Sequence, residues 1–314
     1  MRVVFAGTPV FSRSSLDALA SHPGVDIVAV YTQPDRRAGR GRKLTASPIK
    51  QRSIELGLEV YQPESFKSPE SVDTLKSLQP DLMIVAAYGL ILPQEVLDIP
   101  RLGCVNVHAS LLPRWRGAAP IQRAIEAGDH VTGITLMHME SGLDTGPILA
   151  VVEIAIEEED TGGSLHDKLS LAGGRLLSAS LDAILEQRLI ATPQQSNRAT
   201  YAHKLTKAEA KIDWSQSAQS IAQKVRALNP WPIACTVFKE KSLKVLDSTP
   251  EKLDTNDVTL LVPGEIIEVN NNGILVATGQ GQLLLRRVQK AGGKHMDAKS
   301  FANGVMLQPG IRFG

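Results

Sequence analysis

The sequence predicts an α/β fold in which a doubly wound, mostly parallel sheet is followed by a small β-barrel. Apolar runs of strand length alternate with helix-length segments through the first part of the chain, and short alternating strands with Gly and Asn turns fill the last part. A length of 314 residues also favours two domains. We expect residues 1–189 to form the first domain, 190–208 a polar linker and 209–314 the second domain.

Each predicted element of the first domain follows from a local pattern. Four apolar runs predict buried parallel strands, namely RVVFAG, VDIVAVYT, DLMIVAAYG and GCVNVHA. Segments with apolar residues at helical spacing predict helices over Pro9–Ala20, Ser47–Leu56, Ser68–Leu78 and Thr161–Gln187. The runs VTGITLMHM and PILAVVEIAI predict two more strands joined by a loop. Gly173 and Gly174 weaken the middle of the last helix.

The second domain is predicted from shorter patterns. A helix is expected over Ser217–Leu228, followed by five strands, CTVFKE, LKVLDS, GEIIEVN, GILVATG and QLLLRRVQ. Five short strands of this kind are typical of a small barrel.

Composition excludes several classes of protein. No apolar run is long enough to span a bilayer, and Met1 leads directly into a strand-like segment, so we expect a cytoplasmic protein with no membrane partner. Cys104 and Cys235 lack the spacing of a zinc site or a disulfide framework, and His138 with Glu140 lacks a third ligand, so we expect no metal.

The charges are unevenly distributed along the chain. Residues 1–200 hold 19 basic and 23 acidic side chains, whereas 201–314 hold 15 and 10. A basic carboxyl-terminal part suits a nucleic-acid backbone, although an excess this small is also compatible with an ordinary solvated surface.

Three polar residues form the candidate catalytic group. Asn106 and His108 are two apart on a predicted strand, so both side chains leave the same face. Asp144 is placed on the loop between the next two strands. An amide and an imidazole can stabilise an oxyanion, and a carboxylate can accept a proton, which together suits acyl transfer. A lone His108 would more often be a satisfied core histidine, but Asn106 and Asp144 favour the catalytic interpretation.

The glycine-containing turns do not match nucleotide-binding fingerprints. The turn after the first strand, Gly7 to Phe11, lacks the second and third glycines and contains Pro9, so a nicotinamide cofactor is not expected. Arg116 and Gly117 can form a helix start at the cleft, where the arginine holds a carboxylate or phosphate or makes a structural ion pair.

The segment HASLLPRWRGAAP, which begins at His108, resembles the signature of folate-dependent formyltransferases, and the whole chain is similar to those that act on tRNA. The resemblance implies a formyltransferase Rossmann-like first domain with Asn106, His108 and Asp144 as the catalytic trio. It implies that the pterin of 10-formyltetrahydrofolate lies against Ser110, Leu111, Leu112 and Pro113. It also implies a monomer whose second domain is an oligonucleotide-binding (OB-like) barrel that binds tRNA.

A basic segment, Gln33–Arg52, carries seven basic side chains against Asp35. Its Gly and Pro content argues against any regular element in the first half, and a disordered, solvated loop is one interpretation. The resemblance favours another, in which this loop enters the tRNA acceptor stem. The side chains that would contact phosphates are Arg36, Arg37, Arg40, Arg42 and Lys43. Arg37 replaces a proline common in the family, so the loop is expected to be less stiff.

The resemblance therefore implies formyl transfer from 10-formyltetrahydrofolate to the α-amino group of methionine on initiator methionyl-tRNA, for translation initiation. Two alternatives remain at this point. A formyltransferase for a sugar or nucleotide amine would share the trio but need no arginine cluster. An RNA-binding module with a vestigial cleft would share the basic surfaces but need no intact trio.

Overall fold

The structure is a computed structural model that describes residues 1–38, 41, 43–251 and 262–314. The chain divides into two compact units. The first comprises Met1–Pro120, Val131–Ala155 and His166–Ala202, and the second comprises Ile121–His130, Ile156–Leu165 and His203–Gly314. Each unit is thus assembled from three separate stretches of sequence.

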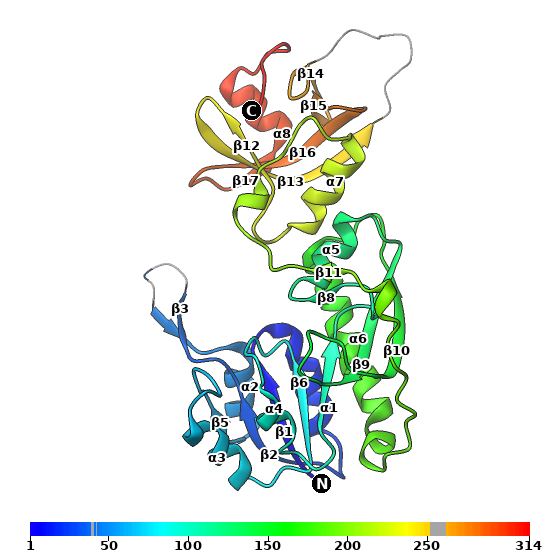
Figure 1. The fold of residues 1–314 in the computed structure, drawn as a ribbon. Helices are drawn as coiled ribbons and strands as arrows, with labels where there is room; N and C mark the ends of the chain where they lie inside the picture. Colours follow the sequence, from blue (N-terminus) through cyan, green and yellow to red (C-terminus); the bar gives the residue numbers. More distant parts are fainter. Residues whose placement is uncertain (39–40, 42, 252–261) are drawn as a thin grey trace. The chain divides into compact units, whose positions relative to one another are not determined.

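A seven-stranded sheet, in the order β10-β9-β7-β6-β1-β2-β5, forms the centre of the first unit (Figure 1). Its strands are β1 (Arg2–Gly7), β2 (Asp26–Tyr31), β5 (Val60–Tyr61), β6 (Leu82–Ala86), β7 (Cys104–His108), β9 (Val131–His138) and β10 (Ile148–Ala155). The first five are parallel, whereas β9 runs antiparallel to β7 and to β10. The four predicted parallel strands are confirmed, and the two-residue β5 is a fifth. Every residue of β6 and β7 is buried. Burial on both faces explains the continuous apolar sequence of β6.

Helices lie between or after these strands, and all except α4 fall within segments where the sequence predicts a helix. They are η1 (Val10–Ser12), α1 (Arg13–Ala20), α2 (Pro48–Glu55), α3 (Pro69–Ser77), α4 (Gln94–Leu97) and α6 (Gly162–Leu185). Ser47 and Ser68 cap α2 and α3, since each hydroxyl oxygen accepts a hydrogen bond from a backbone N–H three residues later. These caps explain why serine followed by proline marks the start of both helices in the sequence.

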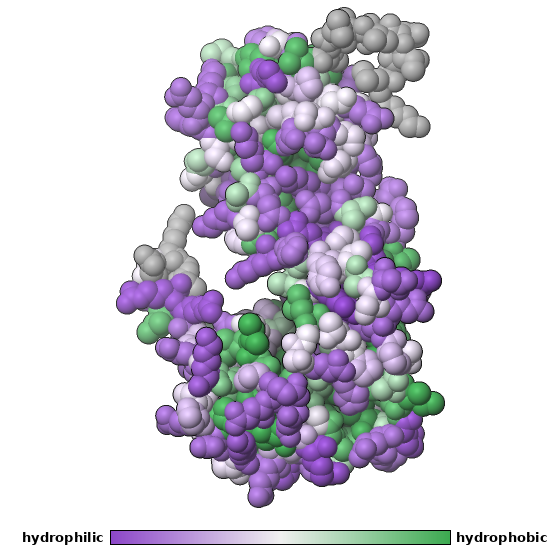
Figure 2. Space-filling view, in the orientation of Figure 1, coloured by the Kyte–Doolittle hydropathy of each residue, from purple (hydrophilic) through white to green (hydrophobic). Residues whose placement is uncertain are grey.

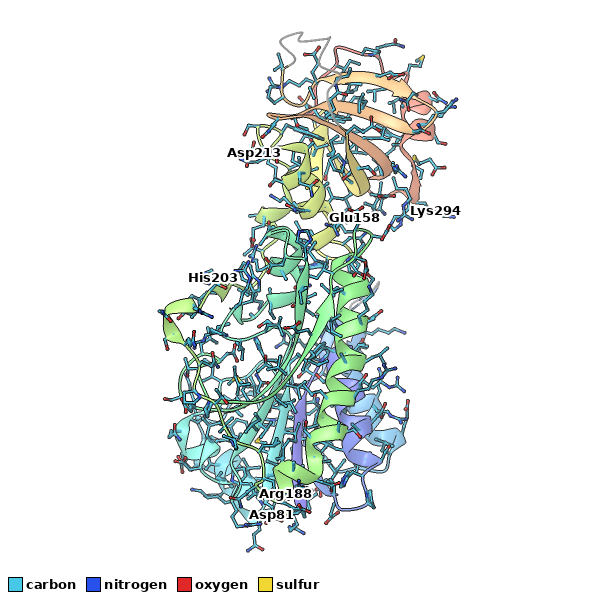
Figure 3. All side chains as sticks on the ribbon, turned by 90° about the vertical axis from the view of Figure 1, so that its right-hand side faces the viewer. Asp81, Glu158, Arg188, His203, Asp213 and Lys294 are labelled. Carbon is cyan, nitrogen blue, oxygen red and sulfur yellow. The ribbon has the colours of Figure 1, made fainter. Side chains whose placement is uncertain are left out.

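The Gly173-Gly174 pair lies within α6, which remains continuous through it (Figure 3). A β-carbon on Gly174 would lie 2.6 Å from the carbonyl oxygen of Ser14, and one on Gly173 would lie 3.0 Å from a methyl group of Val107. Two glycines lower the helix propensity of this segment, but they let α6 approach α1 and β7 closely.

The basic segment forms a hairpin, and the prediction that its first half has no regular element is wrong. Strand β3 (Arg36–Ala38) pairs antiparallel with β4 (Lys43–Thr45). Glycine and proline disfavour a helix or a central strand, but they permit two short strands that pair only with each other. The hairpin projects from the rest of the first unit (Figure 1), and its surface is mainly hydrophilic (Figure 2).

A small two-stranded sheet involves part of the predicted linker. Strand β8 (Arg116–Gly117) pairs in parallel with β11 (Tyr201–Ala202), and Thr192 forms a bridge with Ile148. A short helix, η2 (Ser196–Arg198), lies between these contacts. Polar residues 190–202 therefore belong to the first unit and are hydrogen-bonded to it.

The second unit contains an antiparallel sheet in the order β12-β13-β16-β15-β14, with β17 also paired to β16. Its elements are α5 (Pro120–Glu126), η3 (Ala208–Ala210), α7 (Ala218–Ala227), β12 (Cys235–Phe238), β13 (Lys241–Glu251), β14 (Ile266–Asn270), β15 (Gly273–Ala277), β16 (Gln282–Lys290), β17 (His295–Asp297) and α8 (Ala298–Val305). All five predicted strands are present, whereas β17 and α8 were not predicted. An apolar core that includes Trp214, Val225 and Phe301 joins α7 and α8 to this sheet.

Within the part of the chain that the structure describes, no helix combines the length and apolar character needed to cross a bilayer.

Candidate active site

Strand β7 positions the first two candidate catalytic residues. The side chains of Asn106 and His108 leave the same face near the carboxyl end of this strand, and the residues are 9% and 6% exposed. In the register of the sheet Asn106 lies between Val85 of β6 and Met137 of β9. Ligands of doubly wound folds bind at this edge, where parallel strands end.

The loop between β9 and β10 brings Asp144 to these residues. One of its carboxylate oxygens, Oδ1, accepts a hydrogen bond from Asn106 Nδ2 at 3.4 Å. The other, Oδ2, lies 3.7 Å from His108 Nδ1 and accepts a hydrogen bond from the backbone N–H of Gly117 at 2.8 Å. The structure therefore brings together the three residues that the sequence singled out.

The second ring nitrogen of His108 has a backbone partner. Nε2 lies 3.0 Å from the carbonyl oxygen of Trp115. A carbonyl oxygen can only accept, so Nε2 must be the donor, and Nδ1 is the ring nitrogen that faces Asp144. An oxyanion bound by His108 Nε2 would therefore compete with the Trp115 carbonyl for this proton.

The Ser110–Pro113 turn is fixed against β9. The hydroxyl of Thr135 donates to the Ser110 carbonyl at 2.7 Å and accepts from the Leu112 N–H at 3.2 Å. The Ser110 hydroxyl donates to the Arg114 carbonyl at 2.6 Å. Ser110 and Leu112 are buried, whereas Leu111 and Pro113 are partly exposed. Only the latter two present side-chain surface to a ligand.

The basic residues of the hairpin are described in part. Arg36, Arg37 and Lys43 are exposed, and a guanidinium nitrogen of Arg36 donates to Gln33 Oε1. Pairing of β3 with β4 places Arg37 opposite Leu44 and Lys43 opposite Ala38. Arg40 and Arg42 lie outside the described residues.

Two polar residues support Asp144 without having been predicted to do so. Arg116 is only 3% exposed, and its Nε and Nη2 donate to Gln194 Oε1 at 3.0 and 2.7 Å. Gln194 Nε2 donates to the carbonyl oxygens of Asp144 and Gly146. Arg116 and Gly117 form β8 rather than the helix start that the sequence suggested. No local pattern identifies Gln194, because its partners are about 50 residues away in sequence.

Metal-binding clusters and the buried Cys104 thiol are two further kinds of reactive group to consider. No cluster of His, Cys, Asp and Glu suited to a metal ion occurs among the residues described. Burial raises the pKa of the Cys104 thiol to about 12, so it is an inert thiol at neutral pH.

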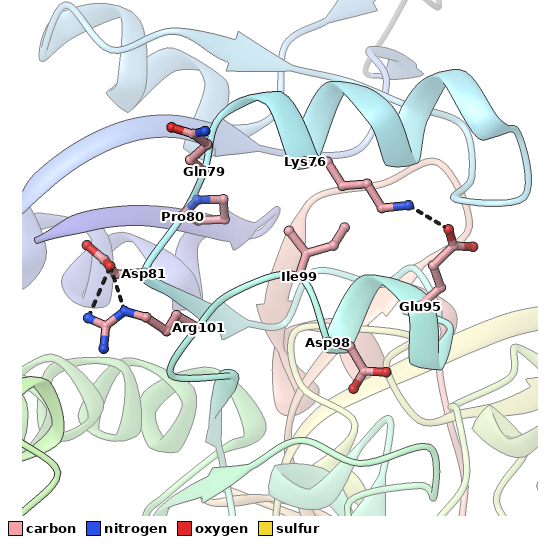
Figure 4. A pocket seen from close by; sticks show the side chains of 8 residues that line it. All are labelled: Lys76, Gln79, Pro80, Asp81, Glu95, Asp98, Ile99 and Arg101. Carbon is pink, nitrogen blue, oxygen red and sulfur yellow. Dashed lines mark hydrogen bonds and ion pairs between the residues drawn. The ribbon is translucent and has the colours of Figure 1, made fainter.

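A separate open pocket of about 600 Å³ lies at the amino end of β6 (Figure 4). Since β6 and β7 are parallel, this is the sheet edge opposite His108. Two ion pairs line the pocket, Lys76 with Glu95 and Arg101 with Asp81. Hydrogen bonds from the Arg2 N–H and from Arg101 lower the pKa of Asp81. The pairing of these charges favours a structural role for them.

Comparison with known proteins shows the family of this chain. A family model described as formyl transferase matches residues 1–181, and one for the formyl transferase C-terminal domain matches 204–306. A methionyl-tRNA formyltransferase of Xanthomonas campestris is 50% identical over 99% of this chain and 100% of its own. One from Stenotrophomonas maltophilia is 52% identical over 96% and 97%.

Solved structures share the fold at low sequence identity. A sugar 3N-formyl transferase, WlaRD, superposes with a TM-score of 0.67 at 15% identity and covers 94% of this chain and 99% of its own. HypX from Aquifex aeolicus, solved in complex with tetrahydrofolic acid, gives a TM-score of 0.62 at 17% identity and covers 98% of this chain and 48% of its own.

Fold and sequence thus define a formyl transferase, an enzyme of a family that uses folate derivatives. Identity of about half over the full length narrows the assignment further, and the chain belongs to the methionyl-tRNA formyltransferase family.

Proposed function

We propose that this enzyme transfers the formyl group of 10-formyltetrahydrofolate to the α-amino group of methionine on initiator methionyl-tRNA, giving formylmethionyl-tRNA. The observation that carries the proposal is the contact of the Asp144 carboxylate with the Asn106 amide and its position facing the His108 ring, at the carboxyl end of β7. Full-length similarity to methionyl-tRNA formyltransferases supports the acceptor. We further propose that it acts as a monomer in the cytoplasm.

The reaction forms one C–N bond and breaks another. The unprotonated α-amine attacks the formyl carbon, and the carbonyl oxygen becomes an oxyanion. Asn106 Nδ2 and His108 Nε2 donate hydrogen bonds to this oxygen. To do so, His108 Nε2 gives up its hydrogen bond to the Trp115 carbonyl. Asp144 accepts the proton that the amine loses, directly or through water. As the tetrahedral intermediate collapses, N10 of the folate leaves with the proton that the amine gave up to Asp144, and the amide remains on methionine.

The surroundings of the trio suit the two substrates. The partly exposed, apolar Leu111 and Pro113 lie three and five residues after His108, and we propose that they contact the pterin within the Ser110–Pro113 turn. Arg36, Arg37 and Lys43, with Arg40 and Arg42, are proposed to contact tRNA phosphates. An exposed basic hairpin has no evident use for a sugar amine, so the hairpin favours tRNA over that alternative.

Transfer of labelled formyl from 10-formyltetrahydrofolate tests the proposal, with initiator methionyl-tRNA, free methionine and an amino sugar as acceptors. We expect product on the charged tRNA alone. We expect Asn106→Ala to lower kcat by about 10²- to 10³-fold, as loss of an oxyanion donor does. Asn303→Ala, at an exposed position of α8, is the matched control and should leave kcat unchanged.

Each result has a defined meaning. Transfer to the amino sugar but not to tRNA would replace the acceptor. Binding of tRNA without any transfer would favour the vestigial-cleft alternative. An Asn106→Ala variant with full activity would remove Asn106 from the proposed mechanism.

A further inference from the structure

Granted the proposed function, we propose that Gln194 is a positioning residue for formyl transfer, which acts by holding the backbone of Asp144, and that Arg116 fixes the orientation of Gln194. The residue lies in the polar segment after α6, between the stretches 1–181 and 204–306 that match the two family models. This segment contributes hydrogen bonds to the candidate active site.

The hydrogen bonds of Gln194 define which way its amide faces. Nε2 donates to the Asp144 carbonyl at 2.9 Å and to the Gly146 carbonyl at 2.7 Å, which uses both of its protons. Oε1 accepts both bonds from the Arg116 guanidinium. Reversing the amide would place the NH₂ group against a cation and the oxygen against two carbonyls. The buried guanidinium therefore acts as an orienting group for the amide.

Hydrogen bonds link Asp144, Gln194 and the Arg116–Gly117 strand into a closed ring. Its carbonyl is held by Gln194, and its carboxylate is held by the N–H of Gly117. Gly117 is the next residue after Arg116, and the Arg116 guanidinium donates hydrogen bonds to Gln194. The peptide of Arg116 is itself fixed, because its N–H donates to the Thr200 carbonyl at 2.9 Å. Strand β8 therefore holds Asp144 in two ways. Gly117 binds its carboxylate directly, and Arg116 holds its backbone carbonyl through Gln194.

Asp144 needs such support because of its backbone conformation. Its φ of 51° lies in the left-handed region, which costs a non-glycine residue conformational energy. Gly146 lies where any β-carbon would come within 1.9 Å of the His138 carbonyl oxygen, so the loop is also in close contact with β9. Removal of the two Gln194 bonds would leave both carbonyls unsatisfied and free the loop to relax. The carboxylate would then move relative to Asn106 and His108.

The test compares Gln194→Glu with Gln194→Met and the neighbouring Gln195→Glu in the full-length enzyme. Glutamate keeps the Arg116 contact but, when ionised, cannot donate to either carbonyl. Methionine has similar length and adds no charge, so it serves if the glutamate variant fails to fold. Gln195 is exposed and receives the same charge change one residue away.

We expect both Gln194 variants to lower kcat by about 10- to 100-fold, with little change in KM for folate or tRNA, because small misplacements of reacting groups slow chemistry strongly. Gln195→Glu should match wild type. Folding is checked by the urea midpoint of each variant.

A double-mutant comparison separates positioning from simple structural support. If Gln194 acts through Asp144, adding Gln194→Met to Asp144→Asn should cost far less than it costs the wild type. Full multiplication of the two losses would overturn the inference, as would unchanged kcat in the single variants. A wild type that transfers no formyl group would instead refute the proposed function.

Discussion

At the scale of single residues, the candidate site depends on directional contacts of a few buried polar groups. Asn106 and Gly117 each donate to a different oxygen of Asp144, so the carboxylate is oriented even though the His108 Nδ1 contact is long at 3.7 Å. Catalytic contacts are often long before substrate binds. The distance is compatible with closure of the pair when charge develops on the imidazole.

His138, at the end of β9, gives a pH-dependence that can be measured apart from catalysis. Burial lowers its pKa below the ordinary 6.5, and Glu140 opposes this in part. The folded state therefore binds this proton less readily than the unfolded state, so His138 destabilises the fold as pH falls through about 6.5.

We expect the free energy of unfolding of the wild type to fall more steeply between pH 7.5 and 5.5 than that of His138→Gln. For a single group the difference in slope cannot exceed about 1.4 kcal/mol per pH unit. Urea unfolding across this range measures it, and the remaining histidines are common to both proteins. Parallel slopes would show that His138 titrates normally in the folded state.

At the scale of elements, the β3–β4 hairpin carries basic side chains on both of its paired strands. Pairing fixes Arg37 and Lys43 at opposite strands of a projecting ribbon. A ribbon of this kind can follow a nucleic-acid backbone, while the candidate active site lies elsewhere in the first unit. Substitutions in the hairpin can therefore test whether it binds tRNA while Asn106, His108 and Asp144 stay unchanged.

Charge reversal in the hairpin should weaken tRNA binding but not folate binding. For Arg37→Glu and Lys43→Glu we expect a higher KM for tRNA and an unchanged KM for folate. The salt slope of log affinity should decrease by about 1 for each phosphate that the hairpin no longer binds. Lys67→Glu, at an exposed lysine outside the hairpin, controls for net charge. Equal effects in all three variants would show that only net charge matters.

At the scale of the whole molecule, the two units do not correspond to two continuous halves of the sequence. The second unit includes Ile121–His130 and Ile156–Leu165. From the first of these stretches Arg123 pairs with Glu209 at 2.6 Å, and in the second the carbonyl of Asp160 accepts from Arg226. A β-carbon on Gly162 would lie 2.4 Å from the Ala227 carbonyl oxygen, so this contact is tight.

A fragment of residues 203–314 should consequently be less stable than the same residues in the intact chain. Hydrogen exchange measures this directly, and we expect the amides of α7 to exchange faster in the fragment because α7 is then without its neighbours at Asp160 and Gly162. Amides shared by β13 and β16 in the centre of the sheet provide the internal comparison. Equal protection of α7 in both proteins would show that the residues after 202 fold independently.

The sequence by itself predicted the main strands of the two large sheets, most of the α-helices and the three polar residues that the structure brings together. Continuous apolar runs report strands buried on both faces, and serine before a helical pattern reports a cap, as at Ser47 and Ser68. The spacing of Asn106 and His108 placed both on one face because strand periodicity is local. The sequence also shows that residues 33–52 are basic, but it did not predict that β3 and β4 pair there.

Only the tertiary structure decided which distant residues meet. No local pattern predicts the left-handed backbone of Asp144, the hydrogen bonds of Gln194 or the neutral partner of Arg116, since each depends on segments far apart in the chain. The same applies to Gly174, whose cost to helix propensity is visible in sequence while its contact with Ser14 is not. Sequence periodicity records burial along an element, whereas hydrogen bonds between elements are fixed only when the sheet and its loops have assembled.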